Sequence, residues 1–329
     1  MITLAVLLIG IIVTFLVMRH IGKKNLKPLT DQEITGPDGA QIEDNGRKII
    51  YKGHTYLFND DIIGILFLGI DRDLSDKEQK KAGTAGQSDT LVLGALNTKT
   101  GHLDLVNVSR DTVTDIVKYN TKGKYAGTEK DQICLAYSYG DGQDKSCLNT
   151  ADAVSKLMYG MPIHMYAAID YSQMATLNDA VNGVPVRVLE DLSDKDPELV
   201  KDKTVNLKGQ QAQTYVRSRR TEELESNNKR MDRQMQYMTE YLKKARQETK
   251  KNILFPFNLY QVVKDNTVTN VRLSQITYLA SRFLRTGFSR GDVKSIPGKI
   301  ESVEGYAALT PDEEKLFEIV LETFYEMTD

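Results

Sequence analysis

The chain has 329 residues, with 43 Lys and Arg against 45 Asp and Glu, four His, two Cys and no Trp. This near-neutral balance argues against a dedicated nucleic-acid-binding protein, and two Cys are too few for a disulfide scaffold or a Cys-rich zinc domain. The apolar fraction of 40% is enough for a sizeable core, so one large domain or two small ones are expected.

An uncharged apolar run covers residues 2–18. About 17 to 20 such residues span the hydrocarbon core of a bilayer, so residues 1–18 are predicted to form a transmembrane anchor. The alternative is a helix buried in a soluble domain. Arg19 and His20 end the run without a cleavage site, so the anchor is expected to be retained. The basic residues behind it favour a cytoplasmic location for the rest of the chain, although large domains translocate despite such charges.

Residues 19–46 are polar and contain several Pro and Gly, a composition that predicts a stalk between the anchor and the folded domain. A hairpin is predicted over 48–58, with its turn at Gly53. Five apolar, β-branched runs then predict strands over 62–70, 91–96, 103–108, 165–169 and 184–189.

Helical patterns alternate with these strands over 149–158, 171–182, 210–216 and 228–251. A last helix is predicted to begin at the capping sequence Thr310-Pro311-Asp312-Glu313. This alternation predicts an α/β domain over 47–329, a three-layer α/β/α sandwich around a mixed central sheet.

Two Asp residues lie at predicted strand ends. Asp71 follows the strand over 62–70, and Asp89 precedes the strand over 91–96. If these strands are neighbours, both carboxylates lie at one edge of the sheet, where open α/β sheets bind ligands. Two carboxylates suit Mg²⁺ bridging to substrate phosphates, whereas the alternative is that each Asp caps a turn.

Arginines accompany other predicted element ends. Arg110 and Asp111 follow the strand over 103–108. Arg217 and Arg219 are two residues apart, a spacing that points both side chains the same way in an extended stretch. Paired guanidinium groups suit bidentate contacts with phosphate, whereas the alternative is an ordinary solvated basic turn.

The long helix over 228–251 has an apolar stripe that includes Met235, Met238 and Leu242. At about 100° per residue, Arg230 and Gln234 flank this stripe, whereas Arg233 is predicted to face solvent on the opposite side. The region 217–251 has eleven basic and six acidic residues. This local excess of positive charge would attract a phosphate-bearing ligand or a membrane surface.

Other chemistry has little support in the sequence. It contains no G-x-S-x-G elbow, no Walker A loop and no G-x-G-x-x-G after a strand. Cys134 and Cys147 would either pair outside the cytoplasm or remain two buried thiols.

The ordered motifs resemble those of the LytR–CpsA–Psr family of cell-wall glycopolymer ligases. The matching segments are FLGID at 67–71, SDT at 88–90, VSRDT at 108–112, AYSYG at 136–140, MPI at 161–163 with ID at 169–170, AVNGVP at 180–185, LKGQQA at 207–212, YVRSR at 215–219 and RMDRQ at 230–234. Each segment alone is weak, but nine of them in this order over about residues 60–250 are specific.

The resemblance implies an apolar pocket for a polyprenyl chain. It also implies transfer of a glycopolymer from a polyprenyl-pyrophosphate carrier to a peptidoglycan hydroxyl. Asp71 and Asp89 match the family's Mg²⁺ ligands, with Mn²⁺ as a possible substitute. The residues that match its pyrophosphate-facing set are Arg110, Arg217, Arg219, Arg230 and Gln234.

Two residues depart from the family pattern: Gln87 replaces an Arg, and Asn227 replaces an acidic residue before Arg230. Asn227 is therefore expected to contact substrate without acting as a base. This leaves Asp89, Asp111 or a metal-bound oxygen to accept the proton of the acceptor hydroxyl.

The implied location is the cell membrane, with a single span and the catalytic domain on the extracellular face. Two other functions fit the same site. One is a membrane-bound regulator that binds polyprenyl phosphates without turnover, and the other is a polyprenyl-pyrophosphatase with water as acceptor.

Overall fold

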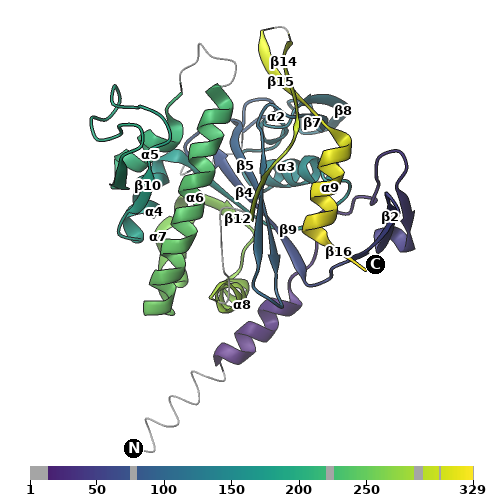
Figure 1. The fold of residues 1–329 in the computed structure, drawn as a ribbon, viewed down its shortest axis with the longest axis horizontal. Coiled ribbons are helices and arrows are strands. Elements are labelled where there is room, and N and C mark those ends of the chain that lie inside the picture. Colours follow the sequence, from purple (N-terminus) through teal and green to yellow (C-terminus); the bar gives the residue numbers. More distant parts are fainter. Residues whose placement is uncertain (1–13, 75–79, 220–225, 285–291, 304, 329) are drawn as a thin grey trace, which may run out of the picture.

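The computed structural model describes residues 14–74, 80–219, 226–284, 292–303 and 305–328 (Figure 1). Its largest sheet has six strands in the order β12-β9-β4-β5-β6-β13. These strands are β12 (Thr267–Thr269), β9 (Ile163–Asp170), β4 (Ile62–Ile70), β5 (Ser88–Asn97), β6 (Leu103–Val108) and β13 (Val293–Ser295). β4 pairs antiparallel with β5 and parallel with β9, so the predicted mixed sheet is confirmed.

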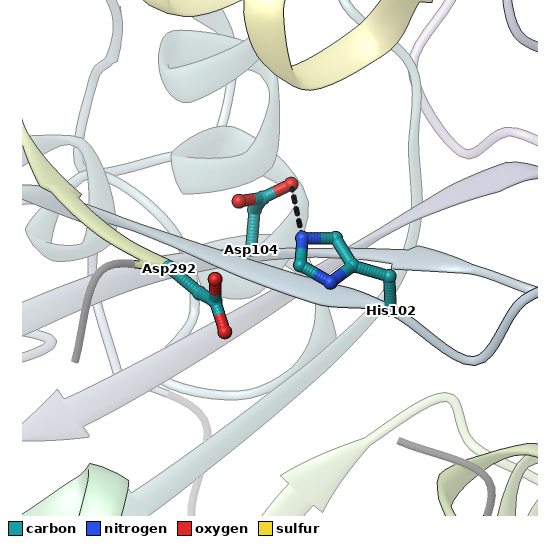
Figure 2. A group of neighbouring side chains, drawn as sticks. All are labelled: His102, Asp104 and Asp292. Atoms are coloured by element: carbon teal, nitrogen blue, oxygen red, sulfur yellow. Dashed lines mark ion pairs between the residues drawn. The ribbon is translucent and has the colours of Figure 1, made fainter. Parts of the chain in front are cut away.

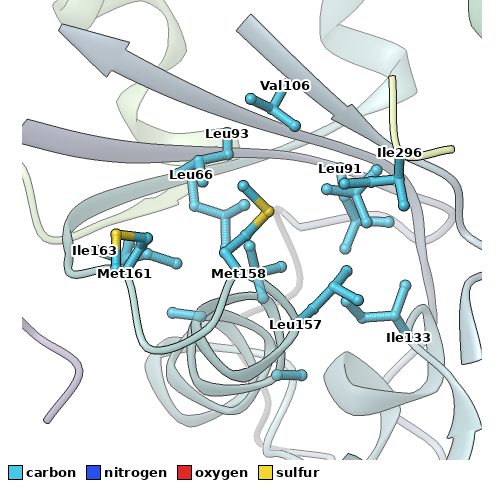
Figure 3. Packing of buried hydrophobic residues seen from close by; sticks show 14 of the residues in the cluster. Leu66, Leu91, Leu93, Val106, Ile133, Leu157, Met158, Met161, Ile163 and Ile296 are labelled. Atoms are coloured by element: carbon cyan, nitrogen blue, oxygen red, sulfur yellow. The ribbon is translucent and has the colours of Figure 1, made fainter. Parts of the chain in front are cut away.

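One face of this sheet packs against α3 (Asp144–Leu157) and α9 (Glu313–Phe324). Successive side chains of a strand point to opposite faces, and Leu66, Leu68 and Ile70 of β4 all enter this core. Figure 3 shows Leu66, Leu91, Leu93 and Val106 of the sheet opposite Leu157 and Met158. Helix α3 begins at Asp144, five residues before the predicted start at Asn149.

The other face packs against α6 (Ser226–Lys251) and α8 (Leu273–Phe283). Ile63 of β4, Val92 of β5 and Met165 of β9 form this core with Met235 of α6. The sheet therefore has helices on both faces, as the alternation of elements predicts (Figure 1).

A third core lies beside the main sheet. It is built by the hairpin β10 (Val184–Arg187) and β11 (Thr204–Leu207) with α4 (Met174–Ala180), α5 (Gln210–Arg217) and part of α6. Helix α6 thus contributes Met235 to one core and Tyr237 to the other.

The amino- and carboxyl-terminal parts of the described chain share a four-stranded sheet in the order β1-β2-β3-β16. Its strands are β1 (Gln41–Glu43), β2 (Lys48–Tyr51), β3 (His54–Phe58) and β16 (Tyr325–Met327). The predicted hairpin at Gly53 is confirmed as β2–β3.

The expected stalk over 19–46 is largely part of the fold. The Leu29 N–H donates to the Ile163 carbonyl at 2.7 Å, and the Thr35 N–H donates to the Tyr159 carbonyl at 3.2 Å. The Thr30 side chain is buried. The prediction of a free stalk is therefore wrong for residues 29–46, because backbone pairing and burial hold this segment to the domain.

Residues 14–24 are helical, and residues 1–13 of the predicted anchor lie outside the described residues. Within the described part of the chain, no helix combines the length and apolar character needed to cross a bilayer. The remaining elements are α2 (Leu135–Ser138), α7 (Phe255–Val263), the 3-10 turns η1 (Asp44–Gly46), η2 (Tyr171–Gln173) and η3 (Lys264–Asn266), and the hairpins β7 (Val113–Tyr119) with β8 (Tyr125–Gln132) and β14 (Gly298–Val303) with β15 (Tyr306–Pro311).

Candidate functional site

Three motif segments meet at one edge of the main sheet. Asp71 follows β4, Asp89 is the second residue of β5, and Arg110 follows β6. The Asp71 N–H donates to the Gln87 carbonyl at 3.2 Å, and the Gln87 N–H donates back to Asp71 Oδ1 at 2.6 Å. Asp71 and Gln87 are thus joined by two hydrogen bonds. The sequence predicts this proximity if β4 and β5 are neighbouring strands, which they are.

Asp89 lies between two guanidinium groups. Arg110 Nη1 donates to Asp89 Oδ1, and Arg230 Nη1 lies 3.8 Å from Asp89 Oδ2. Arg110 is also held by Gln87, whose Oε1 accepts from Arg110 Nη2 at 2.5 Å. Arg110, which follows β6, and Arg230 of α6 therefore converge on one carboxylate of β5.

Asp111 is a second, more buried carboxylate in the same cluster. Its Oδ2 accepts from Asn227 Nδ2 at 2.5 Å, its Oδ1 accepts from Gln132 Nε2 at 3.2 Å, and Arg110 Nε lies 3.6 Å from Oδ1. Burial raises the pKa of Asp111, and the nearby guanidinium groups of Arg110, Arg219 and Arg230 partly oppose this effect.

Arg230 is the most deeply buried guanidinium group of the cluster. Its Nη2 donates to Asn227 Oδ1 at 2.8 Å. Its Nε–H is buried and has no hydrogen-bond partner among the described residues. Burial, together with the charge of Arg110, lowers the pKa of Arg230. A buried donor without a partner costs free energy, and an anion bound here would remove that cost.

Arg217 and Arg219 lie at the rim of this cluster. The pKa of Arg219 is lowered by burial and by the neighbouring charge of Arg230, which places the two guanidinium groups within electrostatic range. The Arg217 guanidinium carbon lies 5.0 Å from the ring centroid of Tyr171. Tyr171 in turn shares a hydrogen bond of 2.8 Å with Thr90, the residue after Asp89.

Two residues of α6, Gln234 and Arg233, bond to carbonyl groups of α5. Gln234 Nε2 donates to the Val216 carbonyl at 3.2 Å, so its amide holds the end of α5. Arg233 is 1% exposed, and the prediction that it faces solvent is wrong. It donates to the Tyr215 carbonyl at 2.8 Å and pairs with Glu190, and burial lowers its pKa to about 10.

Sequence reasoning missed Gln132, Tyr171 and Ser109. Ser109 accepts from Asn227 Nδ2 at 3.4 Å. Tyr171 follows the carboxyl end of β9, and this position at a strand end was a usable signal. Gln132 ends the polar strand β8, where nothing in the local pattern indicates a site.

Comparison with known proteins identifies the domain. The family model described as "LytR_cpsA_psr family" matches residues 34–324. The chain belongs to the LytR_cpsA_psr family. The resemblance carried by the motifs is thereby confirmed.

Members of this family with similar sequences carry names that describe an activity. The "Polyisoprenyl-teichoic acid--peptidoglycan teichoic acid transferase TagU" of Bacillus cereus is 28% identical over 242 residues, which cover 72% of this chain and 69% of that protein. TagU of Bacillus subtilis is 25% identical over 264 residues, covering 80% and 77%.

Solved structures of this family have the same fold. Bacillus subtilis TagV matches with a TM-score of 0.62 and 26% identity over 80% of this chain and 96% of that one. A structure described as TagT bound to LIIa-WTA matches with a TM-score of 0.59 at 20% identity, covering 80% and 90%, and supports the fold alone.

The expected Mg²⁺ ligands of the LytR_cpsA_psr chain lie at the cluster. Mg²⁺ commonly takes one or two carboxylates and completes its shell with water and substrate phosphate. Asp71 is exposed and Asp89 is partly buried, so the pair offers hard oxygen donors of the right kind. The donor chemistry fits, although Arg110 already occupies one oxygen of Asp89.

Within the described residues, a group of three or more possible metal ligands occurs at His102, Asp104 and Asp292. Figure 2 shows the His102 ring beside Asp104, and His102 Nε2 lies 3.5 Å from Asp104 Oδ2. His102 and Asp104 lie at the start of β6, away from Arg110, which follows the end of that strand. Lys294 Nζ already lies 4.0 Å from Asp104 Oδ1, so a cationic group is present there without a metal.

The apolar residues of the central strands divide between the two faces of the sheet. Val92 faces α6, whereas Leu93 and Val106 face α3. A cavity of about 200 Å³ lies between α6 and β13, lined by Asp232, Met235, Gln236, Thr239, Glu240, Val293 and Ser295. The α6 side therefore combines an apolar layer with this cavity.

Both cysteines are free and buried. Cys134 lies in the cluster, where Arg110 Nη2 donates to its Sγ at 3.5 Å, whereas Cys147 belongs to the core beneath α3. The sequence left open either a disulfide or two buried thiols. The structure has two buried thiols.

Proposed function

We propose that this chain transfers a glycopolymer from a polyprenyl-pyrophosphate carrier to a hydroxyl group of peptidoglycan. The observation that carries the proposal is the convergence of Arg110, Arg219 and Arg230 at the sheet edge, with the Arg230 Nε–H buried and unsatisfied among the described residues. The names of the similar TagU proteins supply the donor and acceptor classes.

The chemistry follows from the charges. The acceptor oxygen attacks the phosphorus that carries the glycopolymer, and the bond to the bridging oxygen of the pyrophosphate breaks. The polyprenyl phosphate leaves with the electron pair of that bond. Guanidinium groups fixed before substrate binds stabilise the developing negative charge without reorganising, which lowers the barrier. Arg217, held over the Tyr171 ring, would extend this cationic surface toward the incoming headgroup.

Asp111 is the best candidate to accept the proton of the attacking hydroxyl. Asp89 accepts a hydrogen bond from Arg110, whereas the nearest guanidinium nitrogen to Asp111 among the described residues is Arg110 Nε at 3.6 Å, and burial raises the pKa of Asp111. A carboxylate with a raised pKa is a stronger base near neutral pH. Asn227 would position this base, and its amide does not compete for the proton.

A divalent cation belongs to the same proposal. Asp71 and Asp89 would hold Mg²⁺, or Mn²⁺ in its place, and the ion would supply further positive charge against the pyrophosphate. Soaking the protein with Mn²⁺ and measuring the paramagnetic broadening of substrate phosphorus signals, in the native chain and in Asp71→Asn, tests this assignment.

The location is proposed from the sequence. Residues 1–18 would anchor the chain in the cell membrane as a single span, and the domain would lie on the extracellular face, where peptidoglycan is assembled. Protease accessibility of the domain in intact cells, compared with lysed cells, tests this orientation.

Reconstituted transfer tests the function. The full chain in lipid vesicles is given a polyprenyl-pyrophosphate-linked glycan and peptidoglycan with Mg²⁺, and polymer attached to peptidoglycan is measured. Arg110→Ala should lose activity by about 100-fold or more. Arg187→Ala is the matched control, because Arg187 forms an exposed pair with Asp202 in the hairpin β10–β11.

The outcome separates the alternatives. Lipid carrier bound without cleavage would favour the regulator. Carrier cleaved to free glycan phosphate in the presence of peptidoglycan would favour the pyrophosphatase. Full transfer by Arg110→Ala would reject the site.

A further inference from the structure

An exposed apolar surface covers the turn between α6 and α7 and the helices beside it. Its side chains are between 37% and 60% exposed: Ile253, Leu254, Phe257, Val262 and Leu273. Single exposed apolar side chains are common on proteins, but several on helices that contact one another, as α7 does with α6 and α8, indicate an interaction surface. The turn is fixed, because Asn252 Oδ1 accepts from the Leu254 N–H at 3.0 Å and the Asn252 carbonyl accepts from the Phe255 N–H at 2.9 Å.

The helix over residues 14–24 lies against the same end of the molecule. Gly22 is buried against α8, where a Cβ would come within 2.1 Å of the Ser274 carbonyl oxygen, so only glycine permits this approach. Gln275 Nε2 also donates to the Asn25 carbonyl at 3.3 Å. In Figure 1 this purple helix, α8 and the lower end of α6 lie at the same end of the molecule.

The amino-terminal helix presents apolar side chains of its own: Phe15, Leu16, Val17 and Ile21 are exposed. The preceding residues continue an uncharged apolar sequence back to Ile2. The packing of Gly22 on α8 therefore places the segment that is proposed to enter the membrane next to the start of α8, which carries Leu273.

Basic side chains surround this end. Lys250, Lys251, Lys264 and Arg272 are exposed, and residues 14–30 contain four further basic residues and no acidic one. The acidic residues over 248–273 are Glu248, which pairs with Lys251, and Asp265. Apolar side chains bordered by lysines are typical of proteins that lie in the interface of an anionic bilayer.

We infer that this surface, formed by the end of α6, α7 and the start of α8, lies in the headgroup region of the bilayer as a second membrane contact. The inference rests on the proposed membrane location and adds to it. The anchor would fix only one point of the domain, whereas the second contact fixes its tilt. The bilayer is favoured over a second protein by the proximity of the anchor segment and by the surrounding positive charge.

This contact would set the height of the candidate site. Arg230 and Lys251 lie 21 residues apart on α6, which is about 32 Å at 1.5 Å per residue. The arginine cluster would stand at the end of α6 remote from the bilayer. A carrier lipid bound there would have to leave the bilayer with part of its tail.

The absence of Trp from the sequence allows a direct test. Phe257→Trp and Leu254→Trp each place one fluorophore on the proposed surface of the full chain. Tyr306→Trp is the matched control, because Tyr306 is 71% exposed on the hairpin β14–β15, at the opposite end of the molecule in Figure 1. Each variant is reconstituted in phosphatidylglycerol vesicles, with and without bromine on the acyl chains.

Brominated lipid should quench the emission of Phe257→Trp and Leu254→Trp at least twofold and leave that of Tyr306→Trp unchanged. Equal quenching of all three variants, or of none, overturns the inference. A blue-shifted but unquenched emission at both test positions overturns it in favour of contact with protein, such as a second copy of the chain.

No glycan donor or peptidoglycan is present in this assay, so its result does not depend on transferase activity. Loss of transfer with quenching intact would reject the proposed function alone. Failure of the chain to sediment with vesicles would overturn the second contact together with the membrane location.

Discussion

The Asn227 side chain donates a hydrogen bond of 2.5 Å to Asp111 Oδ2. Through its other polar atom, Asn227 accepts a bond of 2.8 Å from Arg230. One neutral amide thus joins the candidate base to the most buried guanidinium group of the site. An amide suits this position because it satisfies a carboxylate and an arginine together without adding charge.

Replacing Asn227 by Asp should change the pH dependence of transfer. A second carboxylate against Asp111 would raise the pKa of the pair, because two like charges in contact disfavour ionisation. Transfer needs the ionised base, so the acidic limb of the pH–rate profile should move upward by about one unit or more. Asn227→Ala, which adds no charge, should move it less. Superimposable profiles for Asn227→Asp and the native chain would contradict the role of Asp111.

Replacing Arg230 by Lys should lower transfer although the positive charge remains. Lysine lacks the planar fork that contacts Asp89 and Asn227, and it lacks the unsatisfied Nε–H. We expect a loss on the order of 100-fold in kcat/KM. Arg187→Lys is the control and should retain activity. Circular dichroism of both variants establishes that they fold, and native kinetics in Arg230→Lys would show that charge alone is sufficient.

His164 should make the fold sensitive to acid. It is buried in β9, its Nδ1 accepts from the Gly64 N–H at 3.1 Å, and burial lowers its pKa to about 4. The unfolded chain takes up the proton first, so this contribution to stability is present above pH 6.5 and is lost as the pH falls toward 4. The loss is at most roughly 3 kcal/mol.

Thermal unfolding of the full chain in detergent at several pH values checks this expectation. His164→Asn keeps an acceptor for the Gly64 N–H and does not titrate, so its midpoint should vary less between pH 6.5 and 4 than that of the native chain. Parallel pH curves for the two proteins would assign the acid sensitivity to other groups.

The two cysteines should be unreactive in the folded protein. Burial raises the pKa of Cys134 to about 11 and also raises that of Cys147, so little thiolate exists at pH 8. Thiol titration should detect almost no reaction in the native chain and two thiols in denaturant, even after oxidative purification. A denatured chain without free thiols would mean that the cysteines pair.

Much of the fold follows from hydrophobic patterns. β4 is apolar on both faces, as expected for a strand covered by helices on both sides, and the Met235 stripe of α6 faces the sheet. The prediction for Arg233 failed because helical periodicity identifies one core-facing side only. The sequence pattern does not reveal that a second core, built by α5 and β10, covers the opposite side of α6.

The short strands β12, β13 and β16 could not be predicted, because three residues carry no recognisable period. The candidate site was also predicted only in part. Strand ends bring Asp89, Arg110 and Asp111 to one edge, as the motif positions indicate. The link from Asp111 through Asn227 to Arg230 depends on how α6 crosses that edge, and local sequence does not determine a crossing geometry.

The small sheet β1-β2-β3-β16 has a consequence for how the chain is made. Tyr325 of β16 pairs with Phe58 of β3, and its hydroxyl donates to the Gly46 carbonyl at 2.8 Å. The edge of β3 must therefore stay open during synthesis until residues 325–327 have been made. Because such distant pairings form slowly, a chain that ends before Tyr325 would leave that edge exposed to aggregation and proteolysis.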